Sequence, residues 1–310
     1  MRALLPALVR SELEARLPAA VEVRWFSDAA EVLAEIPHAE IAWIDLPGAN
    51  LDEALRRAQS LRWLFTVAAG VDYFDLELLA EKGVTFTNGS GLTAVAVAEY
   101  AVLGMLAAAK RFDHVVRLAD RHEWPDQAPG RIELDGSRAL IVGFGAIGSR
   151  VARMLSGFNV ATTGVTRSGH NGTIPASDWR GRLGEFDWVV LAAPATSETH
   201  AMIGARELAA MKQGAWLVNV GRGDLVDQDA LVAALRAGRI GGAFLDPATP
   251  EPLPPDHPLW AEENCLMSMH LSGRSQSRLM SRAADLFVEN ARAYLAGQPM
   301  RNLVDLKAGY

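Results

Sequence analysis

A glycine-rich turn between a predicted strand and a predicted helix constrains this chain more than any other feature. Ala139 to Val142 are apolar, Gly143, Gly145 and Gly148 follow at G-x-G-x-x-G spacing, and an amphipathic run continues to about Ser156. Such glycines permit a tight turn and a close backbone approach to a pyrophosphate, whose charge the N-terminus of the helix favours. The alternative is a turn that binds nothing. The flanking strand and helix favour dinucleotide binding.

Composition excludes several classes of protein. With 310 residues, half of them hydrophobic and 22% charged, the chain has an ordinary soluble globular mix and room for one large or two ordinary domains. The net charge of −7 argues against a general nucleic-acid surface. No apolar run is long enough to span a bilayer, and Pro6 and Arg10 interrupt the N-terminal apolar stretch, so we expect no secretory signal.

The chain has a single cysteine, Cys265. One cysteine excludes an intramolecular disulfide and a cysteine-rich metal site. Because Cys265 lies in an apolar, strand-like run, we expect a buried, unreactive thiol. The sequence therefore predicts a cytoplasmic protein with no metal site and with neither nucleic acid nor membrane as a partner.

The first hundred residues alternate between strand-like and helix-like segments. Repeated βα units predict a parallel sheet covered on both faces. The expected strands are Val21 to Phe26, Ile41 to Ile44, Leu61 to Thr66 and Val84 to Thr87, and the helical patterns between them include Asp28 to Glu35, Leu51 to Ser60 and Asp72 to Lys82.

The segment Val67 to Asp72, VAAGVD, directly follows a predicted strand. Its small residues leave backbone N–H groups accessible, which suits a carboxylate ligand. It is equally well interpreted as a plain βα turn in which Asp72 caps the next helix. Composition and spacing leave both interpretations open.

A long apolar helix is expected from Val95 to Arg111. It is too apolar for a surface helix, so it either crosses between domains or packs against another chain. Arg117 to Gly136 is polar and predicts an exposed connection. Trp124 within it is expected to anchor packing, with a pocket or subunit-interface role as the alternative.

The cofactor type depends on the end of the next predicted strand, Val160 to Val165. An NAD site usually has Asp or Glu there for the ribose 2′-hydroxyl, but this chain has Thr166, Arg167 and Ser168. An arginine without a carboxylate favours a 2′-phosphate, hence NADP over NAD. The alternative is a chance surface arginine.

Three later predicted strands are each followed by a polar residue. Arg222 follows the strand from Trp216 to Val220, Asp246 follows the strand from Ile240 to Leu245, and His270 follows the strand from Cys265 to Met269. A proline-rich loop between the last two carries Glu251. Each side chain alone could be structural or solvated. Because ligands bind at the carboxyl ends of parallel strands, the set predicts a site.

These residue types suit the reduction of a 2-keto acid. Arg222 could hold the carboxylate and polarise the ketone. His270 could donate the proton to the alkoxide, with Glu251 orienting the imidazole.

The sequence resembles the D-2-hydroxyacid dehydrogenase family over nearly its whole length. The motifs that carry the resemblance are VGFGAIG, the run from Thr199 through VNVGRGDLVDQDALVAALRAGRIGGAFLD, EPLPPDHPLW and MHLSG. Thr166-Arg167-Ser168, EPLP with HPLW and the C-terminal AGY are most similar to the glyoxylate/hydroxypyruvate reductase branch.

The resemblance implies a set of site residues. Arg222, Glu251 and His270 would be catalytic, Ala69, Gly70 and Val71 would bind the substrate carboxylate with Arg222, and Asp246 would bind the nicotinamide carboxamide. The full set expected to contact the cofactor is Gly143, Gly145, Ala146, Ile147, Thr166, Arg167, Ser168, Pro194, Thr199, Val220 and Asp246.

The resemblance also implies an architecture. We expect two doubly wound parallel-sheet α/β domains, a flavodoxin-like substrate domain and a Rossmann domain, with the active site in the cleft between them. The helical segment Ser275 to Ala296 is expected to return to the first domain. The expected substrate-binding domain consists of residues 1–97 and 274–310. The expected Rossmann domain consists of residues 98–273 and binds the cofactor, NADP(H) by preference or NAD(H). Family members are usually dimers that associate through the cofactor domain. In some of them a tryptophan of the partner chain lines the substrate pocket, and Trp124 is the candidate for that residue here.

The sequence departs from the family pattern in four places. Met269 stands where proline is usual, and Leu271-Ser272 replace Ile-Ala. Pro247 follows Asp246 where valine is common, and Gly221 precedes Arg222 where alanine is usual.

Two other functions stay open. A phosphite-type dehydrogenase could use the same fold, whereas the formate enzymes pair their histidine with Gln rather than with a residue like Glu251. A dinucleotide-sensing binding protein, like the co-repressors of this superfamily, would retain the same residues.

Overall fold

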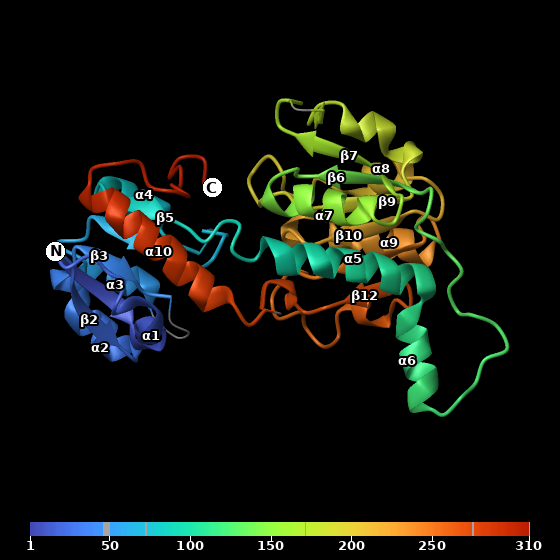
Figure 1. Ribbon diagram of the computed structural model, residues 1–310. Helices are drawn as coiled ribbons and strands as arrows, with labels where there is room; N and C mark the ends of the chain where they lie inside the picture. The colour runs from blue at the N-terminus through green and yellow to red at the C-terminus, as the bar shows by residue number, and fades with distance from the viewer. Residues whose placement is uncertain (46–49, 72, 171, 275, 310) are drawn as a thin grey trace. The chain divides into compact units, whose positions relative to one another are not determined.

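The computed structural model describes residues 1–45, 50–71, 73–170, 172–274 and 276–309. The chain divides into two compact units, one formed by Met1–Thr93 with Gln276–Tyr310 and the other by Ala94–Ser275. Each unit contains one sheet, and every pair of named strands in the described part of the chain is parallel. Helices cover the sheets (Figure 1). The expected α/β class with two parallel sheets is confirmed.

The first unit has a five-stranded sheet in the order β2-β1-β3-β4-β5, which is the flavodoxin-like order. Its strands are β1 (Arg2–Pro6), β2 (Glu22–Phe26), β3 (Ile41–Trp43), β4 (Trp63–Phe65) and β5 (Thr85–Thr87). Its helices are α1 (Arg10–Leu13), α2 (Ala29–Glu35), α3 (Leu51–Arg57), α4 (Leu76–Glu81) and α10 (Leu279–Leu295), with the 3₁₀ turns η1 (Ala7–Val9) and η2 (Ile36–His38).

Alternating side chains of this sheet enter two separate cores, because successive residues of a strand face opposite sides. Trp43 and Phe65 lie on the face that packs against Phe287 of α10, with ring centroids 5.7 and 5.5 Å from Phe287. Leu4 and Leu64 lie in the other core, with side chains of α2, α3 and α4.

Two details of the first unit differ from expectation. β1 has no counterpart among the expected strands, because its short apolar run ends at Pro6 and shows no alternation. The helix expected from Asp72 begins at Leu76, because Asp75 accepts a hydrogen bond from the N–H of Leu78 at 2.9 Å and so caps the helix there.

The second unit has a seven-stranded sheet in the order β12-β11-β10-β9-β6-β7-β8. Its strands are β6 (Arg138–Val142), β7 (Ala161–Thr166), β8 (Ile174–Pro175), β9 (Trp188–Leu191), β10 (Trp216–Asn219), β11 (Gly242–Leu245) and β12 (Cys265–Met267). Its helices are α5 (Ala94–Lys110), α6 (Phe112–Asp120), α7 (Ala146–Ser156), α8 (Ala205–Ala210) and α9 (Gln228–Arg236), with 3₁₀ segments η3 (Trp179–Glu185), η4 (Gly223–Leu225), η5 (Pro258–Ala261) and η6 (Ser272–Arg274).

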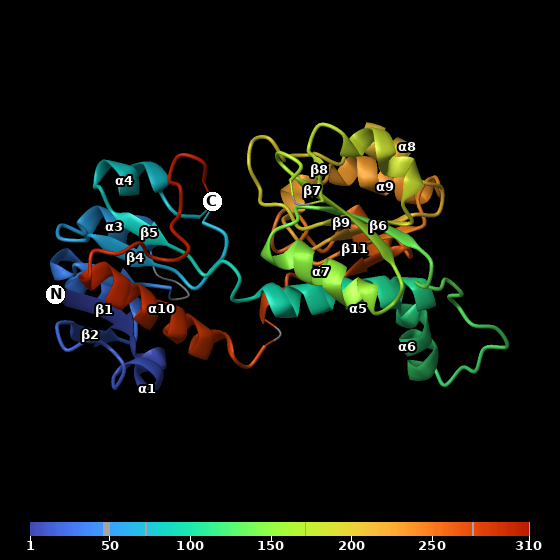
Figure 2. The ribbon, with the colours of Figure 1, turned by 45° about the horizontal axis from the view of Figure 1, so that its top comes forward.

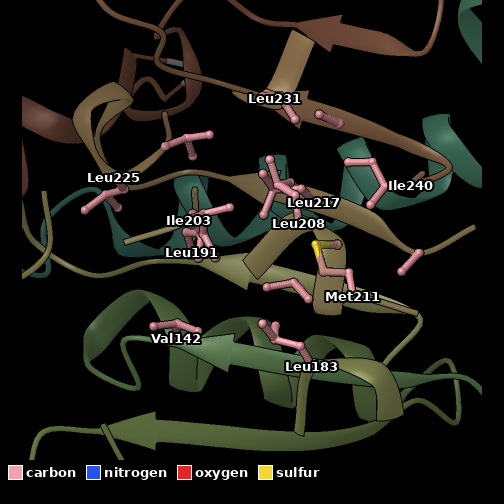
Figure 3. Packing of buried hydrophobic residues seen from close by; sticks show 14 of the residues in the cluster. Val142, Leu183, Leu191, Ile203, Leu208, Met211, Leu217, Leu225, Leu231 and Ile240 are labelled. Carbon is pink, nitrogen blue, oxygen red and sulfur yellow. The ribbon is translucent and has the colours of Figure 1, made fainter. Parts of the chain in front are cut away.

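Helices cover both faces of this sheet (Figure 2). On one face Val142, Leu191 and Leu217 pack with Leu208 of α8 and Leu231 of α9 (Figure 3). On the other, the sheet packs against α5 and α7. The order places β6 next to β9, where the direction of winding reverses and ligands of such sheets bind.

The helix expected from Val95 to Arg111 is α5, and it lies in a core of its own unit rather than on the surface. The expected domain boundary at residues 97 and 98 lies inside α5, which belongs as a whole to the second unit. The polar connection expected from Arg117 was placed too early, since α6 continues to Asp120.

Trp124 does not anchor packing within this chain, because 97% of its surface is exposed. In the described ranges, no helix is both long and apolar enough to cross a membrane. The same ranges hold no group of three or more His, Cys, Asp or Glu side chains placed to bind a metal.

α5 packs tightly against the sheet at Gly104. A Cβ atom there would lie 2.4 Å from the Phe244 ring. We expect Gly104→Val to lower the free energy of unfolding by ~1–3 kcal/mol, because the ring cannot move within a filled core. Thermal unfolding measures the effect, with Leu103→Val at an exposed position of the same helix as control. An equal effect of both changes would contradict this packing.

Candidate functional site

The glycine turn after β6 is shaped by close backbone contacts. Gly143 has φ +94°, and a Cβ there would lie 2.5 Å from the backbone nitrogen of Ala193, which follows β9. A Cβ on Gly148 would lie 2.1 Å from the carbonyl oxygen of Gly143. Only glycine fits at both positions, so the turn holds the start of α7 against the ends of β6 and β9.

The same turn leaves room at its second glycine, Gly145. A Cβ on Gly145 would meet no atom within 4 Å, and Gly145 and Ala146 are exposed. The first N–H groups of a helix have no partner within it, and α7 has no acidic residue in its first turn. These features fit the pyrophosphate of a dinucleotide, which Ala146 and Ile147 would hold through their N–H groups.

At the end of β7 the side chains are tied to their own loop. Thr166 Oγ1 lies 2.7 Å from Thr173 Oγ1, and Ser168 Oγ lies 3.0 Å from His170 Nδ1. Arg167 donates to Glu198 at 2.7 Å, with both side chains about two-thirds exposed. The carboxylate at the end of β7 is therefore that of Glu198, from the loop after β9. Its position could not be predicted by counting residues from the glycine-rich turn.

Two residues of that loop that are expected to contact the cofactor, Pro194 and Thr199, are joined by a hydrogen bond. The hydroxyl of Thr199 donates to the carbonyl of Pro194 at 2.7 Å and accepts the N–H of Thr196 at 2.8 Å. Val220, at the end of β10, is buried and donates its N–H to the carbonyl of Leu191 at 3.0 Å.

The structure brings Glu251 and His270 together. Glu251 Oε2 lies 2.7 Å from His270 Nδ1, and the two side chains are 45% and 37% exposed. A carboxylate on Nδ1 fixes that nitrogen as the donor and leaves Nε2 for a reacting group. A pocket of about 150 Å³ adjoins the pair, lined by side chains that include Leu253, Trp260 and Met269.

His270 sits in an uncommon turn. Met269 and His270 have φ values of 48° and 55°, in the left-handed region that disfavours side chains. The N–H of His270 donates to the carbonyl of Asp246 at 2.7 Å, and the N–H of Leu271 donates to that of Ser268 at 3.1 Å. Proline is locked near −65°, so the proline usual in the family could not adopt the conformation of Met269.

The carboxylate of Asp246 holds this turn. It is buried, and its Oδ1 accepts Ser268 Oγ at 2.6 Å and the N–H groups of Leu271 and Ser272 at 3.1 and 3.2 Å. Its Oδ2 accepts the hydroxyl of Ser272. The serine that replaces alanine thus adds a donor to Asp246, a role that the sequence did not reveal.

Arg222 follows β10, the neighbour of β11. The amide of Asn219 donates to the carbonyl of Arg222 at 2.7 Å, and Arg222 Nη1 donates to the carbonyl of Gly221 at 3.0 Å. A Cβ on Gly221 would lie 2.8 Å from the carbonyl oxygen of Ala193, so alanine would not fit here without a shift. Asn219 was not among the expected site residues, although it stands three positions before Arg222 in the run of family-like sequence that follows Thr199.

The loop that carries Glu251 is held against the arginine turn. A Cβ on Gly223 would lie 2.2 Å from Thr249 Oγ1. Gln228 accepts the N–H of Thr249 at 3.1 Å and donates to its carbonyl. Gln228, in the same run of family-like sequence, was not among the expected site residues either.

The remaining expected residues lie elsewhere. Ala69, Gly70 and Val71 belong to the first unit, after β4, and Asp72 lies outside the described residues. Burial raises the pKa of the Cys265 thiol to about 12, as expected for an unreactive cysteine.

Comparison with known proteins identifies the family. The sequence model of the NAD binding domain of D-isomer specific 2-hydroxyacid dehydrogenases matches residues 102–272. This chain belongs to the D-isomer specific 2-hydroxyacid dehydrogenase family. Its cofactor is therefore a nicotinamide dinucleotide.

Individual relatives cover most of the chain. It is 35% identical over 269 residues to a glyoxylate reductase of Korarchaeum cryptofilum, covering 82% of this chain and 79% of the relative. A crystal structure of a family member from Aeromonas salmonicida has a TM-score of 0.87 at 29% identity and covers 98% of this chain and 99% of its own. The NADPH-dependent glyoxylate/hydroxypyruvate reductase of Sinorhizobium meliloti, in complex with NADP and malonate, has a TM-score of 0.76 at 26% identity and covers 99% of this chain and 97% of its own.

Proposed function

We propose that this protein reduces a small 2-keto acid of the glyoxylate/hydroxypyruvate type to the D-2-hydroxy acid, with NADPH preferred over NADH. The observation that carries the proposal is the Glu251–His270 pair, 2.7 Å apart beside a pocket and on a sheet whose glycine turn fits a dinucleotide. The similarity to a glyoxylate reductase at 35% identity supports the substrate class.

In the proposed mechanism, His270 is the general acid. Its Nδ1 is held by Glu251, so its Nε2 donates the proton to the oxygen of the reduced ketone and removes the hydroxyl proton in the reverse direction. A bound nicotinamide cofactor supplies the hydride.

The other side chains bind and polarise the substrate. The guanidinium of Arg222 holds the carboxylate and stabilises charge that develops on the ketone oxygen. The N–H groups of Ala69, Gly70 and Val71 are proposed as further carboxylate donors. Asp246 holds the turn that carries His270. Its proposed contact with the nicotinamide carboxamide would use lone pairs of the Asp246 carboxylate that do not already accept hydrogen bonds from that turn.

The proposed assembly is a homodimer through the cofactor domain. α6 has no buried residue, and Phe112 and Val116 on it are 55% and 45% exposed. Such an apolar surface, continued by the exposed Trp124, supports burial against a second copy.

The first test of the proposed function is turnover. We expect the purified protein to oxidise NADPH with glyoxylate or hydroxypyruvate, and faster than NADH, with pyruvate and phenylpyruvate as comparison substrates. Loss of the reduced-nicotinamide absorbance measures the rate. Cofactor binding without turnover on any of these acids would contradict an enzymatic role and favour a dinucleotide sensor.

The role of His270 has its own test. We expect His270→Ala to lower kcat for keto-acid reduction by about 10²-fold or more, the scale of a lost general acid. His38→Ala, which removes an exposed histidine from the first unit, is the control. Near-normal kcat in His270→Ala would remove His270 from the mechanism.

The cofactor preference rests on Arg167. We expect Arg167→Ala to raise the KM for NADPH by about tenfold, the scale of one charge-assisted hydrogen bond, and to leave the KM for NADH nearly unchanged. Glu198→Gln is the matched control, because it removes the ion pair and leaves the guanidinium in place. Equal changes for both cofactors would contradict contact with the 2′-phosphate.

A further inference from the structure

The loop after β4 has most of its backbone polar groups fixed by the first unit itself. The N–H of Ala68 donates to Thr66 Oγ1 at 3.2 Å, and the carbonyl of Ala68 accepts the N–H of Gly89 at 2.8 Å. The carbonyl of Ala69 accepts the side-chain amide of Asn88 at 2.8 Å. These contacts set the orientation of every peptide plane up to Ala69.

The N–H groups of the next three residues differ from those before them. Among the described residues, none accepts a hydrogen bond from the N–H of Ala69, Gly70 or Val71. Ala69 is exposed and Gly70 is partly exposed. Consecutive backbone N–H groups in a turn can form an anion site. The upstream contacts therefore fix the backbone that leads into these N–H groups.

Asp45 is the charged group in that upstream network. It lies two residues after β3 and is partly buried. Its Oδ1 accepts the hydroxyl of Thr66 at 2.6 Å, and its Oδ2 accepts the N–H of Val67. Burial raises the pKa of its carboxyl, as expected for a carboxylate withdrawn from water.

The direction of these bonds makes the carboxylate essential to the network. Because the Thr66 hydroxyl donates its proton to Asp45, its oxygen is left to accept the N–H of Ala68. The hydroxyl of Tyr73 lies 3.3 Å from the same oxygen. The two donors reach different oxygens of Asp45, and an asparagine at 45 would place an NH2 group, which cannot accept, at one of these two positions.

We propose that Asp45 is a positioning residue for substrate, which fixes Thr66 and Val67 so that the N–H groups of Ala69, Gly70 and Val71 are aimed at the carboxylate of the keto acid. This inference rests on the proposed function and deepens it. Asp45 belongs to the first unit and accepts hydrogen bonds from Thr66 and Val67 of that unit, so we expect its replacement to act on the keto acid and not on the cofactor.

The test separates KM from kcat. Asp45→Asn and Thr66→Val are expected to raise the KM for glyoxylate by about tenfold or more, because a misaligned donor set weakens substrate positioning. The kcat and the KM for NADPH are expected to stay within about twofold. Thr66→Ser, which keeps the hydroxyl, is expected to restore the KM.

Asp75→Ala is the matched control. It removes another carboxylate of the same unit that holds backbone, at the start of α4, and it leaves the loop network intact. It is expected to lower the melting temperature without changing the KM for glyoxylate. A KM that is unchanged in Asp45→Asn and Thr66→Val, or raised equally in Asp75→Ala, overturns the role of Asp45 while the proposed function stands. Failure of the unsubstituted protein to turn over any keto acid overturns both.

Discussion

Parallel strand pairing in the seven-stranded sheet is the constraint on which the catalytic residues depend. Because β10, β11 and β12 are adjacent and parallel, their carboxyl ends lie at one edge. Residues far apart in sequence, Arg222, Asp246 and His270, follow these three ends in turn. The glycine turn after β6 lies at the same edge, at the point where the winding reverses. The strand ends therefore supply the chemistry, and the loops beyond them set its geometry.

The sequence predicted what depends on local pattern and on this topology. The glycine spacing predicted the turn. The position of His270 after a strand, with Glu251 on the loop between that strand and the one before it, predicted a common site, because ligands bind at the carboxyl ends of parallel strands. Sequence could not predict the partners that join separate loops. Glu198 reaches Arg167 from thirty-one positions away, and Asp45, after β3, reaches Val67, after the adjacent strand β4. Such pairs depend on loop conformations that periodicity does not encode. β1 was missed because a short buried strand shows no alternation.

The departures from the family pattern also have local physical causes. Met269 and His270 occupy left-handed backbone, which costs of order 1–3 kcal/mol at each residue and persists only where surrounding contacts determine it. Asp246 supplies those contacts through its carbonyl and both carboxylate oxygens. The two serines, Ser268 and Ser272, and the absence of proline at 269 are thus parts of one arrangement. A proline at 269 would exclude the observed turn.

Asp45 and Asp246 use the same physical device in the two units. Each is a carboxylate withdrawn from water, and each accepts a backbone N–H and a hydroxyl from the segment that follows a neighbouring strand. A charged acceptor makes stronger hydrogen bonds than a neutral one and is costly to leave unpaired, so it permits few loop conformations. In the first unit the fixed segment presents N–H groups, and in the second it presents an imidazole. Buried carboxylates that touch no reacting atom can therefore determine where the reacting groups lie.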